Sequence, residues 1–215
     1  MPSPEMEQTA ASHTHRYRPP EDGERLRALL EGKALCPLAA VCQGDEVEAR
    51  LAPCPSGEPL RFLSPDAEET IRALSEAIRF LPKVTWKTSH TEMLLNGLRD
   101  GRWHGMALEQ QKTANLVSYL DYCLREELNE VEIGFCMTHP DHRGRGLVSR
   151  LLASLLLLHF HRDFRVSTHE SNLPMSRALA RFGFTVVEER PRDRINGETT
   201  LYLTRKAGTG FPLEA

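Results

Sequence analysis

The sequence predicts a mixed α/β domain that follows an N-terminal extension. Apolar and polar residues alternate along 130–138, as they do in a strand with one buried face. Apolar residues recur at helical spacing along 67–81, and strand-like and helix-like segments then follow one another along the chain. With 215 residues, the chain is long enough to bury one substantial core.

The N-terminal part is predicted to be an accessory segment. Residues 1–22 are rich in Pro, Ser, Thr and Glu, so we expect a mobile tail there. A short helix is expected over 23–30, and the segments 38–41 and 47–51 are expected to pair as a hairpin.

From Leu60 onward, helices and strands are predicted in a regular order. After a strand at 60–63, Ser64 and Pro65 mark the start of a helix, since Ser caps helices and Pro is favoured in the first turn. The leucine-rich helix over 146–160 has apolar residues on several faces, so we expect it to be heavily buried. The other expected elements are helices over 91–98 and 172–182 and strands at 103–109, 114–124, 130–138, 164–167, 184–189 and 199–204.

Composition argues against several classes of protein. The formal charge of −3 disfavours nonspecific binding to nucleic acid. The longest apolar run, around 151–158, is much shorter than the roughly 20 residues that span a bilayer, so no membrane partner is expected. The N-terminus has no basic start followed by an apolar block, which predicts a cytoplasmic protein. Five scattered cysteines without a closely spaced ligand pair fit reduced thiols, and no metal site is expected.

The clearest chemical signal lies where the strand 130–138 passes through a short loop into the leucine-rich helix. Gly144 and Gly146 allow this loop to turn so that several backbone N–H groups converge, and the helix N-terminus adds its positive dipole. Arg143 and Arg145 can add positive charge. The loop is therefore suited to bind a diphosphate.

This loop and two features after it resemble the GNAT superfamily of acyl-CoA-dependent N-acyltransferases. The family signature is Arg or Gln, two residues, Gly, one residue, then Gly or Ala. Asn172 and the pair Gly183 and Phe184 follow in the order and spacing of the family. Val148 departs from the signature, because the family has a small residue there. The signature positions read Arg143, Gly144, Arg145, Gly146, Leu147 and Val148.

The resemblance covers 60–205 and implies a mostly antiparallel central sheet, flanked by helices and splayed between its fourth and fifth strands. It also implies acetyl-CoA as the acyl donor and an amine as the acceptor. An exposed strand edge suits the amide-bearing pantetheine arm, because that arm can satisfy unpaired backbone groups much as a further strand would. By position, the cofactor-binding residues are the main chain of Cys136, Met137 and Thr138, the loop 143–148, and Asn172.

A base and an acid are needed for this chemistry. Glu132 is the first candidate for the base and Asp121 the second. If the apolar sides of their strands pair, the two carboxylates share the opposite face, and a register that places them side by side would raise one pKa. The alternative interpretation is two solvated strand charges. The family often uses a tyrosine as the acid that protonates the thiolate, but this chain has Leu179 at that position.

These observations predict an N-acetyltransferase that acts on a primary amine of a small molecule or a protein by direct attack. A noncatalytic acyl-CoA-binding or protein-interaction module is the alternative, favoured by Val148 and Leu179. Sheet-edge homodimers are common in the resembled family. The expected organisation is a mobile tail at 1–22, an accessory segment at 23–59, the acetyltransferase domain at 60–205 and a C-terminal tail at 206–215.

Overall fold

A computed structural model of the chain describes residues 13–19, 21–31, 35–43, 46–53, 59–63, 92, 95–109, 116–194 and 197–212. The expected helix after Ser64 lies outside the described residues. Of the helix expected over 91–98, residue 92 and residues 95–98 are described, and they are helical. Within the described part of the chain, no helix is both long enough and apolar enough to cross a membrane.

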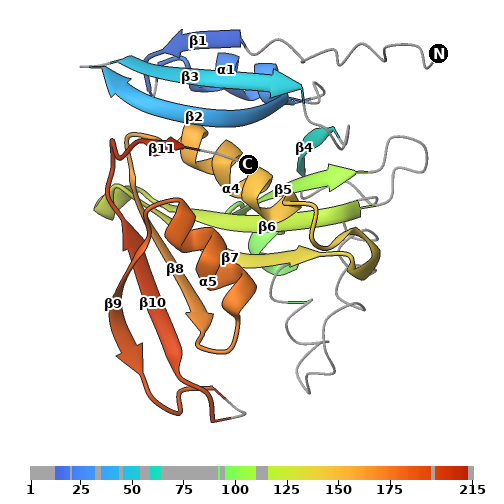
Figure 1. Ribbon diagram of the computed structural model, residues 1–215, viewed down its shortest axis with the longest axis vertical. Helices are drawn as coiled ribbons and strands as arrows, with labels where there is room; N and C mark the ends of the chain where they lie inside the picture. The colour runs from blue at the N-terminus through green and yellow to red at the C-terminus, as the bar shows by residue number, and fades with distance from the viewer. Residues whose placement is uncertain are drawn as a thin grey trace, which may run out of the picture.

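The larger of two sheets has seven strands in the order β4-β5-β6-β7-β8-β10-β9 (Figure 1). Its described neighbours pair antiparallel, except for β7 and β8, which run parallel. This arrangement confirms the mixed, mostly antiparallel sheet. The strands are β4 (Leu60–Leu63), β5 (Trp103–Glu109), β6 (Leu116–Arg125), β7 (Glu130–Thr138), β8 (Asp163–His169), β9 (Thr185–Arg190) and β10 (Thr200–Arg205).

A second sheet of four strands contains both ends of the described chain. The expected hairpin forms from β2 (Leu35–Gln43) and β3 (Glu46–Pro53), and the expected short helix is α1 (Gly23–Leu30). Strand β1 (His13–Tyr17) pairs with β3, and β11 (Phe211–Pro212) pairs with β2.

The two outer strands of this second sheet differ from the predicted tails. Residues 13–17 and 211–212 belong to stretches in which we expected no regular structure. One buried aromatic residue in each strand accounts for the difference, because Tyr17 is 6% exposed and Phe211 is 2% exposed. The Tyr17 hydroxyl also donates a buried hydrogen bond of 2.6 Å to the Leu157 carbonyl.

Helix α4 (Leu147–Leu158) lies between the two sheets (Figure 1). Ten of its twelve residues are buried, which confirms the expected heavy burial. The four-stranded sheet explains why leucines cover several faces of the helix, since one side packs on β2 and another on β5, β6 and β7. The single-turn helix η2 (Pro140–His142) joins β7 to α4, and α5 (Leu173–Arg181) follows β8.

Candidate acyl-CoA site

Strands β7 and β8 pair only along their first halves. Their register runs from Glu130 opposite Asp163 to Ile133 opposite Val166, although β7 continues to Thr138 and β8 to His169. Beyond these pairs the two strands point apart (Figure 1). Since β7 and β8 are the fourth and fifth strands of the sheet, this is the splay that the resemblance implies.

The splayed half of β7 presents backbone groups toward β8. The His139 N–H donates to the Val117 carbonyl at 2.9 Å, and positions 138, 137 and 136 pair in register with 118, 119 and 120. Antiparallel ladders alternate, so Met137 directs its N–H and C=O toward β6, while Cys136 and Thr138 direct theirs toward the splay. Consistently, the Ser118 hydroxyl donates to the Met137 carbonyl, whereas the Thr138 carbonyl accepts from Arg143 Nε.

The loop after β7 has the backbone geometry of an anion-binding turn. Gly144 and Gly146 have φ values of +77° and +71°, a conformation that disfavours residues with a Cβ atom. A Cβ atom placed on either glycine would meet no described atom within 4 Å, so the loop is open on that side. The first turn of α4, which is described throughout, contains no acidic side chain that would repel a phosphate.

The side chains around this loop leave its backbone accessible. The exposed side chain of Arg145 contacts His142 Nδ1 at 2.7 Å. Val148, the departure from the family signature, packs against the core as a partly buried residue of α4. Its larger side chain therefore points into the protein and not into the loop. These features fit a diphosphate held by backbone N–H groups.

Two residues of the resembled family pattern lie in or beside α5: Asn172 at its start and Leu179 within it. Asn172 is the N-cap of α5, and its Oδ1 accepts from the Met175 N–H at 3.4 Å. The residue thus lies just beyond the end of β8, on the other side of the splay from β7. Leu179 is 0% exposed in the main hydrophobic core, and its hydrocarbon side chain has no proton to donate.

Asp121 and Glu132 share one sheet face but do not lie opposite each other. Glu132 pairs with Cys123, and a bulge in β7 shifts the register between Leu120 and Tyr122, so that Asp121 faces the bulge. The expected side-by-side register is therefore wrong, because the β6–β7 turn pairs Arg125 with Glu130 and so sets Glu132 opposite Cys123, two residues from Asp121. The Glu132 side chain is 41% exposed and lies 3.4 Å from Arg125 Nη1, whereas Asp121 is 0% exposed.

Burial dominates the electrostatics of Asp121. Loss of solvation raises the pKa of its carboxyl group to about 7, against the opposing effect of hydrogen bonds from the Phe135 N–H and the Tyr119 hydroxyl. Tyr119 was expected to be a packing residue and not part of the site, although it lies two residues before Asp121, the spacing that places side chains on one face of a strand.

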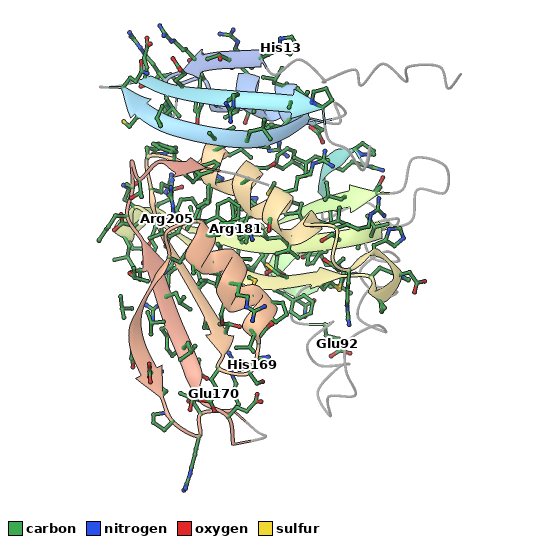
Figure 2. All side chains as sticks on the ribbon, viewed as in Figure 1. His13, Glu92, His169, Glu170, Arg181 and Arg205 are labelled. Atoms are coloured by element: carbon green, nitrogen blue, oxygen red, sulfur yellow. The ribbon has the colours of Figure 1, made fainter. Side chains whose placement is uncertain are left out.

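A second polar cluster lies at the far end of β8, where Figure 2 shows His169 and Glu170. His169 Nδ1 lies 2.9 Å from Ser171 Oγ and 3.1 Å from Glu198 Oε2. Ser171 donates to Glu198 at 2.6 Å. Ser171 and Glu198 were not predicted, because local periodicity does not reveal the turn that brings Glu198 beside β8.

A surface hollow and the candidate metal ligands were also compared with the site. A hollow of about 430 Å³ at the edge of the four-stranded sheet is lined by Arg18, Phe160 and His161, among others, and by none of the candidate residues. Among the described residues, no group of three His, Cys, Asp or Glu side chains could hold a metal ion.

Residues 71–184 match the acetyltransferase (GNAT) family, and this match covers more than half of the chain. The chain therefore belongs to the GNAT acetyltransferase family. None of the curated proteins matches it.

Solved structures with the same fold are similar at low sequence identity. One is the ribosomal-protein-S18-alanine N-acetyltransferase of Escherichia coli, at 14% identity and a TM-score of 0.59, covering 70% of this chain and 95% of that one. Another is the ribosomal L7/L12 α-N-protein acetyltransferase in complex with coenzyme A, at 16% identity and a TM-score of 0.58, covering 72% and 98%. A spermidine N-acetyltransferase chimera from Vibrio cholerae and hSSAT shares 16% identity with a TM-score of 0.55, covering 68% and 94%.

Proposed function

We propose that this protein transfers the acetyl group of acetyl-CoA to a primary amine of a small molecule or a protein by direct attack. The observation that carries the proposal is the splay between β7 and β8, which opens beside a glycine loop at the start of a buried helix. These two features accommodate the two chemically different parts of one ligand, an amide-bearing arm and a diphosphate.

The residues that would hold the donor lie along one path. Outward-facing backbone groups of Cys136 and Thr138 bind the pantetheine amides, with Met137 between them holding the strand to β6. Backbone N–H groups in the loop 143–148 bind the diphosphate, with Arg143 and Arg145 beside them. Asn172 contacts the arm from the start of α5. When bound, the donor supplies an activated thioester.

Glu132 is the base of the proposed reaction. It is the residue before the last β7–β8 pair, so it lies where the splay begins. Its partly exposed carboxylate can accept a proton from an ammonium acceptor and pass it to water, while Arg125 orients it. Asp121, the second candidate, is fully buried and does not reach solvent.

A noncatalytic acyl-CoA-binding module is the second candidate function, and the burial of Leu179 favours it. Leu179 cannot protonate a departing thiolate, so that proton must come from water or another group, or the thiol must leave directly. Release of free thiol in the presence of an amine distinguishes the two functions.

The test combines binding and turnover on the full chain. Calorimetry measures coenzyme A binding, and a thiol-release assay with acetyl-CoA screens peptides with free N-termini, lysine peptides and polyamines. The panel reflects the ribosomal-protein and spermidine acetyltransferases to which the fold is similar. Binding together with turnover of one acceptor class supports the enzyme, and binding without turnover across the panel supports the module.

Glu132→Gln tests the base. We expect turnover to fall about 100-fold or more with little change in coenzyme A affinity. Glu127→Gln is the matched control, because Glu127 also lies near Arg125 but belongs to the turn before β7 and is 70% exposed. Unchanged turnover in Glu132→Gln would remove Glu132 from the mechanism.

A further inference from the structure

The bulge in β7 takes one backbone group out of the normal ladder with β6. Leu120 pairs with Cys136 and Tyr122 pairs with Ile133, so Asp121 alone faces both Gly134 and Phe135. A bulge leaves its extra residue without a regular ladder partner and bends the strand. In a buried setting, the backbone N–H that is displaced needs another acceptor.

The side chain of Asp121 supplies this acceptor. Its Oδ1 accepts from the Phe135 N–H at 2.6 Å, and its Oδ2 accepts from the Tyr119 hydroxyl at 3.1 Å. The carboxyl group is 0% exposed, so it cannot exchange these partners for water without opening the sheet. A buried carboxyl group with both oxygens engaged is held in one orientation.

Gly134 and Trp103 close the space around this carboxyl group. A Cβ atom on Gly134 would overlap both Asp121 Oδ1 and the Trp103 ring, so only glycine permits this close approach. The indole, Phe135 and Leu98 belong to or pack against the small hydrophobic cluster around Tyr119 and Met137, on the sheet face away from α4. Asp121 is therefore held tightly in β6, opposite the bulge at which β7 leaves β8.

We propose that Asp121 is a positioning residue, whose buried carboxyl group holds the Phe135 N–H at the bulge and so orients the splayed segment 136–138 that receives the acyl donor. This inference rests on the proposed function, because the segment has to be the donor-binding strand. It gives Asp121 a role that needs no contact with the amine and no proton transfer to it.

The titration of Asp121 gives a second, independent way to test its proposed role. Burial raises its pKa to about 7, and the Tyr119 hydroxyl bond opposes that rise. Among the described residues, the titratable groups that face this carboxyl group are Tyr119 of β6, whose hydroxyl group shifts its pKa, and Cys136 of β7, whose own pKa the carboxylate raises, while β5 contributes the uncharged indole of Trp103. A neutral carboxyl group can still accept from the Phe135 N–H through its carbonyl oxygen and donate to the Tyr119 hydroxyl oxygen. The hydrogen bond between Asp121 and the Phe135 N–H, here called the anchor, is therefore retained in both charge states of Asp121.

The first experiment follows the Phe135 amide by NMR in ligand-free protein labelled with ¹⁵N-phenylalanine, of which the chain has eight. We expect its amide signal to move with a midpoint near pH 7. The movement should be absent in Asp121→Asn, which keeps an amide oxygen for Phe135 but does not titrate. In Tyr119→Phe the midpoint should rise, because a hydrogen bond that stabilises the carboxylate is lost.

The second experiment measures coenzyme A affinity by calorimetry in the same variants. Asp121→Ala removes the acceptor and should raise the Kd about tenfold, whereas Asp121→Asn and Tyr119→Phe should change it less than about threefold. Val131→Ala truncates a buried residue in the paired half of the same strand, and it controls for destabilisation alone. Its Kd should match that of the unchanged protein.

Each outcome decides the inference. A Phe135 amide that does not titrate, or that titrates equally in Asp121→Asn, would overturn the anchor. An unchanged Kd in folded Asp121→Ala would overturn its role in donor binding, and if that variant does not fold, the amide titration decides. Failure of the unchanged protein to bind coenzyme A would contradict the proposed function, while the ligand-free NMR result would still test the anchor.

Discussion

The two halves of β7 have different roles although they belong to one strand. Residues 130–133 pair with β8, and their inward side chains, Val131 and Ile133, are 0% and 3% exposed. Residues 134–138 leave β8 and begin with a bulge that only glycine accommodates at its first position. The first half contributes to the stability of the sheet. The second half keeps its pairing with β6 but gives up pairing with β8, which makes backbone groups available to a ligand where the regular sheet is interrupted.

Asp121, the β6 residue that faces the splayed half, should give the largest effect, as a pH dependence of stability. Its pKa is about 7 in the folded protein and 3.8 as a free side chain, so between about pH 4 and pH 7 the folded state holds a proton that the unfolded state releases. Stability should therefore fall as the pH rises through this window and level off above it. The full effect is on the order of 4 kcal/mol. Denaturant unfolding of the unchanged protein and of Asp121→Asn from pH 4 to 8 measures it, and parallel curves would contradict this account.

Gly134→Ala should disrupt the splayed half directly. The added methyl group overlaps Asp121 Oδ1 and Trp103, so the bulge or the indole must move. We expect a loss of about 3 kcal/mol in unfolding free energy together with weaker coenzyme A binding. Chemical unfolding and calorimetry test both effects. Retention of full affinity would show that the close packing at the bulge does not shape the donor site.

Val131→Ala should separate stability from binding. Val131 is fully buried in the paired half, so the truncation should cost about 2 kcal/mol of unfolding free energy. Coenzyme A affinity should not change, because the residue lies outside the splay. A parallel loss of affinity would contradict the division of β7 into two roles.

Gly146→Ala should give the smallest stability change but a clear loss of binding. Its φ of +71° costs a residue with a Cβ atom about 1 kcal/mol, although the space around it is open among the described atoms. The strain should turn the backbone N–H groups of the loop and weaken coenzyme A binding. Gly197→Ala is the matched control, because Gly197 also has a positive φ, of +80°, but lies in the turn before β10. Equal affinities in the two variants would argue against the loop as the diphosphate site.

The sequence predicted well those features that local patterns encode. Alternation identified β7, glycine spacing identified the loop before α4, and the leucine-rich helix is buried on several sides as expected. These signals are strong because each arises from neighbours within a few residues.

Long-range pairing accounts for what the sequence did not predict. Strands β1 and β11 each depend on one buried aromatic residue and on partners far along the chain, so no local periodicity reveals them. The predicted register of Asp121 and Glu132 was wrong because the geometry of the β6–β7 turn sets which residues pair, and alternation alone fixes only the face on which they lie. The turn before β10, which places Glu198 beside His169, is likewise not revealed by local sequence patterns.

The most direct test of the central claim is a calorimetric titration of the full chain with coenzyme A, repeated with the Gly146→Ala variant. We predict saturable binding at one site with a Kd below about 1 mM, and weaker binding in the variant. Absence of binding heat from the folded, unchanged protein at millimolar ligand would contradict it.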